Sequence, residues 1–420
     1  MFERVSLGGQ LYSGRHAHGI VTNLLPLAGS RAVFTRVLLA CYALTGVLHL
    51  GSITLSTLLP FHLVALGGSR TQIGLLFSAT TVVSMLLRPT IGTWIDLFGA
   101  RRVILPGIAL LAGATLALHV PRSPEAVIAV MLGAGIGQGL ISMTGNMLAV
   151  RASTPATRGE VLSLYYLSSS LAIAVAPPMA FGLQRLGGMP LAFVVVTVLA
   201  SVMLVLATSL PESVTAPVPG VTPGFRPLSW RAVPVSCALS LITIGYSSIY
   251  AFLPLYAVSR GHGAAVVWFF TVYSLWLIVC RALLGRASDR IGRARVALPA
   301  MVVTALAYFV LALPLTSLSM MASALLLATG GAVLYPTLAA LVVDRAVDGE
   351  RGLALGTLSA SWDLGVVVGS ALIGFIADRF SFASGFATAG ITGALGGLVF
   401  FLTERRFATS RGTIAAVHGG

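Results

Sequence analysis

Lysine is absent from this 420-residue chain, and charge of either sign is scarce, since only 9% of the residues are Asp, Glu, Lys or Arg. An ordinary soluble domain carries about 25% charged residues. Hydrophobic residues make up 57% of the sequence. Water therefore cannot be the solvent for most of the surface, and an ordinary soluble domain is excluded.

The chain also lacks the residue patterns of common catalytic and metal sites. Its three cysteines, Cys41, Cys237 and Cys280, lie inside apolar runs without paired spacing, which supports neither a disulfide nor a metal site. There is no nucleotide-binding loop, no His/Asp/Glu cluster and no nucleophile motif. We expect no enzymatic activity, no cofactor, no nucleic-acid partner and no direct use of ATP.

Apolar runs long enough to cross a hydrocarbon core of about 30 Å recur along the whole chain. Their lengths predict an all-α membrane protein with twelve transmembrane helices. The predicted spans are residues 34–58, 71–95, 102–120, 125–149, 160–183, 190–209, 232–257, 264–286, 295–315, 318–342, 353–377 and 383–403.

A proline-rich stretch divides the chain in the middle, with prolines at 211, 217, 219, 223 and 227. Proline lacks the backbone N–H that a helix interior needs, so this stretch is predicted to be a linker. The predicted organisation is an N-terminal tail, a six-helix bundle, a linker, a second six-helix bundle and a C-terminal tail. Their bounds are 1–33, 34–209, 210–231, 232–403 and 404–420.

The 26 basic residues, all arginine, are distributed asymmetrically about the predicted spans. The side that carries both tails and the linker holds 19 of them, the opposite side holds five, and Arg88 and Arg281 lie within spans. Arginine in short loops is enriched on the cytoplasmic side. We therefore expect both termini in the cytoplasm and a multi-pass protein of the bacterial inner membrane. Residues 1–33 do not show the features of a secretory signal, in which a charged segment is followed by an apolar stretch and a cleavage site.

The two halves repeat each other at an offset of 193 residues. Residues 86–106 align with 279–299 at eight identical positions, among them Arg88/Arg281, Gly99/Gly292 and Pro106/Pro299. The same offset pairs Gly137 with Gly330. This register predicts two parallel, pseudo-symmetric bundles related by an axis along the membrane normal, with the substrate site at their interface.

Two copies of one loop motif carry a resemblance to a known family. Gly92, Asp96, Gly99, Arg101 and Arg102 lie between the second and third spans, and the second copy consists of Gly285, Asp289, Arg290, Gly292 and Arg293. Both copies resemble the cytoplasmic signature loop of the major facilitator superfamily. The resemblance of the chain to this family extends over about residues 34–405. One departure is Leu97, which stands where the family usually has arginine.

The resemblance implies a monomeric transporter in the lipid bilayer that works by alternating access. It also implies that these loops gate the cytoplasmic side, with Asp96 closing onto the end of the eleventh span when the opposite side is open.

Polar and aromatic side chains recur on one face of several spans. In the first span Thr45, His49, Ser52 and Ser56 are spaced as one helical face. Polar groups in lipid are costly and normally face the bundle interior, although small polar residues also form hydrogen bonds between helices. The predicted cavity-lining set is His49, Ser52, Ser56, Gln138, Ser142, Asn146, Tyr166, Ser170, Thr243, Tyr246, Tyr250, Tyr335 and Trp362.

Ionisable residues inside the spans are candidates for coupling or substrate contact. Asp363 is the one carboxylate that we predict near the bilayer midplane. An ionised carboxylate there costs about 2.5 kcal/mol or more, so a coupling proton or a structural hydrogen bond would explain it. His49 is the second candidate proton carrier. Arg88 and Arg281 are candidate contacts for an anion, and turning toward the headgroups explains them equally well.

The favoured function is secondary active transport, with export of a small amphiphilic organic compound ahead of uptake of a neutral solute. An aromatic cavity with few charges suits dispersion and stacking contacts with such a compound. A membrane receptor or assembly factor on the same scaffold is the alternative from a different class. It would tolerate loss of the loop motifs, and both copies are present. The sequence leaves the coupling ion and the direction open.

Overall fold

The computed structural model describes residues 33–154, 157–210, 228–284, 287–347 and 350–418. The side chains of Arg88, Asp96, Asp289 and residues 406–418 lie outside this description, as does all of Gly285. Within the described ranges the chain is helical, without strands. Eleven of its helices are long and apolar enough to cross a membrane, which confirms the predicted all-α membrane fold.

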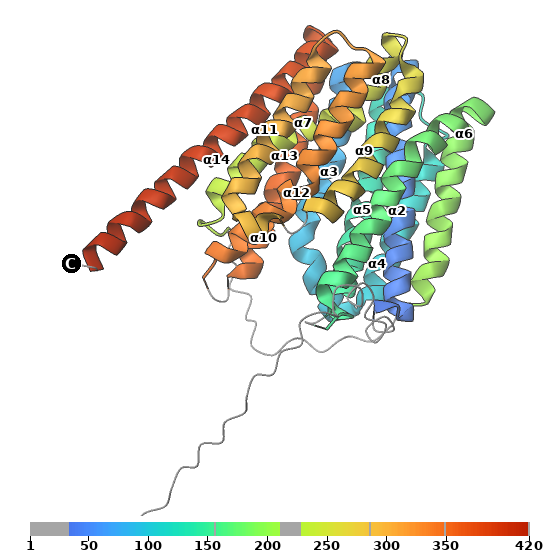
Figure 1. Cartoon of the computed structure of the whole chain (residues 1–420). Helices are drawn as coiled ribbons and strands as arrows, with labels where there is room; N and C mark the ends of the chain where they lie inside the picture. The colour runs from blue at the N-terminus through green and yellow to red at the C-terminus, as the bar shows by residue number, and fades with distance from the viewer. Residues whose placement is uncertain (1–32, 155–156, 211–227, 285–286, 348–349, 419–420) are drawn as a thin grey trace, which may run out of the picture.

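The N-terminal bundle consists of α2 (Arg36–Ala65), α3 (Arg70–Phe98), α4 (Ala100–Ala117), α5 (Pro124–Arg151) and α6 (Arg158–Thr208). Helix α6 has 51 residues, a length of about 76 Å at 1.5 Å per residue and too much for one crossing. At Gly188 the backbone leaves the helix with φ 69°. Figure 1 shows α6 as two helical segments that meet at one end of the bundle. Helix α6 therefore holds the predicted fifth and sixth spans.

The C-terminal bundle contains the remaining helices. They are α7 (Val233–Ala251), α8 (Leu253–Ser259), α9 (Gly263–Leu284), α10 (Ala287–Ile291), α11 (Arg293–Ala312), α12 (Ser317–Arg345), α13 (Arg351–Arg379) and α14 (Phe382–His418). The predicted seventh span is broken at Phe252, just before Pro254, and continues as α8. Helix α14 runs on through most of the segment predicted as a tail. With α6 counted twice and α7 joined to α8, the described residues account for the twelve predicted spans.

The internal repeat is visible in the local structure of both bundles. Gly99 and Gly292 precede α4 and α11 with φ 85° and 105°, a region that favours glycine. Ser123 and Thr316, which are repeat partners, cap α5 and α12 through their hydroxyl groups. The two halves therefore begin corresponding helices in the same way.

The same correspondence extends to helix packing. A Cβ on Gly137 of α5 would overlap the carbonyl oxygen of Gly107 on α4, and one on its partner Gly330 of α12 would overlap the carbonyl oxygen of Ala300 on α11. Ala300 is itself the repeat partner of Gly107. Small residues allow this close backbone approach, which replaces hydrophobic attraction as a source of helix association in lipid.

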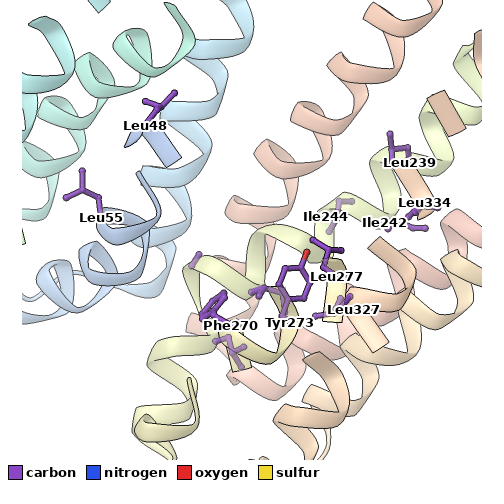
Figure 2. Packing of buried hydrophobic residues seen from close by; sticks show 14 of the residues in the cluster. Leu48, Leu55, Leu239, Ile242, Ile244, Phe270, Tyr273, Leu277, Leu327 and Leu334 are labelled. Atoms are coloured by element: carbon purple, nitrogen blue, oxygen red, sulfur yellow. The ribbon is translucent and has the colours of Figure 1, made fainter. Parts of the chain in front are cut away.

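The two bundles lie side by side, and their main mutual contacts join α3 to α13 and α6 to α9 (Figure 1). One cluster of buried apolar residues extends through both bundles. Figure 2 shows Leu48 and Leu55 of α2 on one side and the labelled residues of α7, α9 and α12, such as Ile242, Tyr273 and Leu334, on the other. We call the end where α3 meets α4 and the linker joins α7 the linker end, and the opposite end, where α2 meets α3, the far end.

Candidate functional site

The two bundles are joined by polar contacts at the far end. Arg70, the first residue of α3, donates a hydrogen bond to the carbonyl oxygen of Ala377 in the last turn of α13. Its guanidinium also lies 4.2 Å from the ring centre of Phe382 at the start of α14. The hydroxyl of Thr71 donates to Asp378 at 2.9 Å. These contacts link the N-terminus of α3 to the C-terminus of α13.

Close backbone packing of α3 on α13 continues inward from this end. A Cβ on Gly74 would overlap the carbonyl oxygen of Ser370, and Gly374 faces Gly74 across the same contact. One turn further, the Ser78 hydroxyl lies 2.7 Å from the carbonyl oxygen of Val367. The far end is therefore closed along the line where α3 meets α13.

Toward the linker end the same two helices have space between or around them. Cβ atoms added at Gly92 of α3 and at Gly352 and Gly356 of α13 would meet nothing within 4 Å. The backbones of α3 and α13 are thus in close contact at the far end, whereas these three glycines nearer the linker end make no such contact.

An aromatic cluster covers one face of the C-terminal bundle, and we call it the aromatic wall. Trp362 of α13 is at its centre, with ring centroids 5.0 Å from Tyr246 of α7 and 5.7 Å from Tyr335 of α12. Tyr246 also contacts Tyr250, which in turn lies 5.4 Å from Phe270 of α9. Four helices therefore contribute rings to one connected surface.

The aromatic wall faces the N-terminal bundle because the other sides of α7 are occupied. Gly245 of α7 packs on Tyr308 of α11, Thr243 packs on Gly365 of α13, and Ala238 packs on Gly396 of α14. Tyr246 and Tyr250 remain half-buried, and α7 has direct contacts with α2. The predicted cavity residues Tyr246, Tyr250, Tyr335 and Trp362 are thus brought together.

The hydroxyl groups of the wall are linked in pairs. The Tyr246 and Tyr250 hydroxyls are 3.2 Å apart, and the Tyr335 hydroxyl lies 2.9 Å from that of Ser359 on α13. Buried tyrosine hydroxyls normally find such a partner. The wall therefore presents ring faces together with a few polar groups that are already oriented.

The N-terminal bundle contributes predicted polar residues from α5 and α6. Gly135 and Gly139 place one side of α5 against α3, which leaves Gln138 and Ser142 half-buried on a neighbouring side. The side-chain amide of Asn146 donates to the Tyr166 hydroxyl at 3.2 Å, and Tyr166 is 47% exposed. This polar surface differs from the aromatic wall, so the two halves of the site are chemically unlike.

The polar residues predicted on one face of α2 have different surroundings in the structure. His49 is half-buried, and its Nδ1 lies 2.8 Å from the Thr45 carbonyl oxygen. A carbonyl oxygen can only accept, so Nδ1 carries the hydrogen and Nε2 is the atom able to take up a proton. Ser56 bonds to the carbonyl oxygen of Ser52. Ser52 itself lines a narrow apolar space against α4 and the second half of α6, away from the aromatic wall.

Two further predicted cavity residues have other surroundings. Thr243 is 1% exposed, bonds to carbonyl oxygens of its own helix and packs on Gly365. It therefore serves the packing of α7 on α13. Ser170 is also buried, but its hydroxyl lies 3.3 Å from a guanidinium nitrogen of Arg281 on α9, so it stands where the two bundles meet.

Asp363 is 7% exposed, in the middle of α13 and next to Trp362 of the aromatic wall. Its role as a proton carrier stays a prediction. Arg281 is exposed and reaches across to α6. The side chain of its repeat partner, Arg88, lies outside the described part of the chain.

The two loop motifs lie at the linker end. Arg101 is half-buried, whereas Arg102 and Arg290 are exposed. Arg293 forms an ion pair with Asp344 of α12 at 3.2 Å and donates to Ser288 at 2.8 Å. The motif of the second half therefore ties α10, α11 and α12 together within one bundle. The roles of Asp96 and Asp289 stay predictions, because their side chains, like all of Gly285, are outside the described residues.

Two aromatic residues of the site were not among the predicted ones. Phe270 is almost fully buried against Tyr250, and Tyr273 stacks on Phe269 within α9. Their spacing of three residues places both on one helical face, and this was the available signal.

A separate cavity of about 280 Å³ lies at the far end, between α2 and α6 on one side and α8 and α9 on the other. Its lining includes Phe61 and Phe181, which are in edge-to-face contact, together with Gln184 and Arg185. None of these residues was among the predicted site residues.

Similar folds occur among solved transporter structures. A crystal structure of the peptide transporter POT in complex with sulfate superposes with a TM-score of 0.73 at 14% identity, over 88% of this chain and 94% of that chain. A mutant of the nucleoside transporter NupG gives a TM-score of 0.70 at 14% identity, over 87% and 99% of the two chains. At this identity the likeness shows the fold alone.

Bacterial membrane transporters are similar to this chain in sequence over most of its length. An uncharacterized MFS-type transporter of Burkholderia mallei (strain SAVP1) is 25% identical over 362 residues, which cover 84% of this chain and 88% of the relative. An uncharacterized MFS-type transporter of Pseudomonas aeruginosa (strain LESB58) is 27% identical over 350 residues, or 81% and 86% of the two chains. The sequence model of the Major Facilitator Superfamily matches residues 41–269 of this chain and, in a second match, residues 235–416. This chain therefore belongs to the Major Facilitator Superfamily and is a membrane transporter of that type.

Proposed function

We propose that the protein is a secondary active transporter that works by alternating access and exports a small amphiphilic organic compound. The observation that carries this proposal is the aromatic wall, which faces the other bundle in a structure whose helices α3 and α13 are in close contact at the far end. Ring faces bind apolar and aromatic groups by dispersion and stacking, and the few oriented hydroxyls suit a compound with one polar part.

The proposed direction follows from the orientation that the arginine distribution predicts. With the linker end in the cytoplasm, we propose that compounds reach the aromatic wall from inside the cell. Release on the other side requires the contacts of Arg70, Thr71 and Gly74 with α13 and α14 to separate. In that second state the motif loops would close the linker end, with Asp96 and Asp289 as the proposed gating carboxylates.

Proton coupling is the proposed source of energy, with two candidate carriers. Asp363 is buried beside Trp362, and His49 presents Nε2 as its protonatable atom. A carrier must exchange its proton with one side in each state, so it has to lie near the path between the bundles. Both residues belong to helices that contact the other bundle, α13 through α3 and α2 through α7.

The test uses purified protein reconstituted in vesicles. Uptake of a panel of amphiphilic aromatic compounds is measured with and without an imposed pH gradient, for the wild type and for Trp362→Ala. We expect gradient-driven transport of at least one aromatic compound, reduced about tenfold or more in the variant because the central ring of the wall is lost.

The matched control is Trp268→Ala, since Trp268 is 63% exposed on α9 and outside the wall. Equal losses in both variants would contradict a role for the wall. Transport of neutral non-aromatic solutes alone, insensitive to Trp362, would instead support the alternative of a solute uptake system.

A further inference from the structure

Arg281 is placed where a cation has no structural need to be. It lies on α9 ten residues before Ile291, the end of α10, and its side chain is exposed. An arginine near the end of a membrane helix normally extends toward the headgroups. Here a guanidinium nitrogen lies 3.3 Å from the hydroxyl of Ser170 on α6. The side chain therefore reaches sideways into the region between the bundles.

Ser170 is well inside the membrane part of its own helix. It is buried and stands twelve residues after Arg158, the first residue of α6. The guanidinium is thus held at a similar depth, and not at the linker-end surface. This contact favours a role for Arg281 between the bundles over extension of its side chain toward the lipid headgroups.

The charge of Arg281 is not balanced by the group that it contacts. Within the described part of the chain its hydrogen-bond partner is the neutral Ser170 hydroxyl, although a guanidinium has five N–H donors. The described arginine–carboxylate pairs, Arg293–Asp344 and Arg345–Glu404, lie elsewhere, at the linker end. The exposed guanidinium therefore keeps donors that a negatively charged ligand between the bundles can use.

Arg281 also lies on the same face of α9 as one ring of the aromatic wall. It follows Phe270 by eleven residues, about three helical turns. A ligand whose ring lies on Trp362 and Tyr246 could therefore place a substituent at the guanidinium. The planar guanidinium matches two oxygens of a carboxylate or another oxyanion with two parallel hydrogen bonds.

We infer that the compound bound between the bundles is an aromatic anion, with its ring on the aromatic wall and its oxyanion on Arg281. This inference rests on the proposed function and narrows it from amphiphilic compounds in general to aromatic oxyanions. Ser170 is then the hydroxyl that holds the guanidinium in place before the anion arrives.

The experiment compares three probes that share one ring system: naphthoate, naphthamide and naphthylmethylammonium. Their equilibrium binding to the purified full-length protein in lipid nanodiscs is measured by titration calorimetry. The proteins are the wild type, Arg281→Gln, Arg281→Lys, Trp362→Ala and the matched control Arg122→Gln, which removes an exposed arginine at the far end.

For the wild type and Arg122→Gln we expect naphthoate to bind about tenfold or more tightly than naphthamide, with the cation weakest, because a charge-assisted pair replaces a neutral contact. Arg281→Gln should lose this preference while its affinity for naphthamide stays within about twofold. Arg281→Lys should keep part of the preference, since a point charge remains without the planar fork.

Binding of naphthamide also shows that each variant is folded. An anion preference that survives in Arg281→Gln would overturn the inference, as would a wild type that binds naphthamide or the cation as tightly as naphthoate. In those cases ring binding that still depends on Trp362 would leave the proposed function standing. Failure of all three probes to bind the wild type would contradict the aromatic wall, and with it both proposals.

Discussion

Arg70, the first residue of α3, donates a hydrogen bond to the carbonyl oxygen of Ala377 in the last turn of α13. A cation at the N-terminus of a helix is at the unfavourable end of that helix's dipole. At the C-terminus of α13 it is favourable, and it satisfies one of the carbonyls that a helix end leaves without a partner. This contact exists between the bundles, so it stabilises the closed far end and not the fold of either bundle.

Replacing Arg70 by alanine should therefore shift the population toward a state with the far end open. A hydrogen bond that involves a charged group contributes about 1.5–3 kcal/mol, which corresponds to a shift of about 10- to 100-fold. The measurement is the spin-label distance between cysteines placed at Val120 and Leu313, in far-end loops of the two bundles, with the three native cysteines replaced. Longer distances should become populated in Arg70→Ala. Arg122→Ala is the control, and identical distance distributions in both variants would exclude this role of Arg70.

The contact between α3 and α13 at the far end also depends on the small size of Gly74. Because its Cβ would overlap the backbone of Ser370, Gly74→Ala should separate α3 from α13 at the far end without disturbing either bundle. The same label pair should report longer distances, and the thermal midpoint should change little. Gly113 of α4 has open space around a Cβ, so Gly113→Ala provides the comparison. A Gly74→Ala protein that keeps the wild-type distances would show that the helices can absorb the methyl group.

The repeated glycine contacts should determine the stability of each bundle. Gly137→Ala and Gly330→Ala each force a methyl group into a backbone contact, and overpacking costs about 1–3 kcal/mol. We expect each variant to lower the apparent thermal midpoint in detergent, and the double variant to lose the sum, because the two sites lie in different bundles. Gly113→Ala should retain the wild-type midpoint. A lower thermal midpoint in only one of the two single variants would mean that the two bundles are not packed equivalently.

Asp363→Asn separates proton coupling from substrate movement. Asparagine keeps the size and hydrogen bonding of the protonated carboxyl but cannot ionise, so accumulation driven by a pH gradient should be abolished while substrate exchange stays measurable. His49→Gln is measured in the same vesicles. Retained accumulation in Asp363→Asn with loss in His49→Gln would assign the proton to Nε2 of His49, and retention in both would exclude both carriers.

Much of the fold could be predicted from the sequence, because bilayer thickness dictates span length and the repeat fixes the register. Gly99 and Gly292 are examples, since these repeat partners both precede a helix with a positive φ. Helix ends were harder to place. Pro254 accompanies a break between α7 and α8, whereas Pro60, at the corresponding place in α2, lies within a continuous helix. The difference depends on tertiary packing around each proline.

The candidate site was predictable only in part, because polarity alone does not determine which way a membrane residue faces. Thr243 and Ser56 satisfy their hydroxyls on carbonyls of their own helices, so such residues can face either a cavity or a neighbouring helix. Aromatic residues are equally ambiguous. Phe270 is 1% exposed and Trp268 is 63% exposed, although both belong to the same apolar segment of α9. Which end of the transporter is closed could not be predicted, since one sequence must serve both states.

The hairpin of α6 has a consequence for how the N-terminal bundle can move. The fifth and sixth crossings meet at Gly188 without an intervening loop, and the first of them carries Ser170, which contacts Arg281 of the other bundle. A displacement at that contact is passed directly into the sixth crossing, whose exposed residues Val198, Val202 and Val205 form part of the outer surface. If the bundles move as proposed, we expect the lipids beside the sixth crossing to rearrange, so that the turnover rate depends on bilayer viscosity and acyl-chain order.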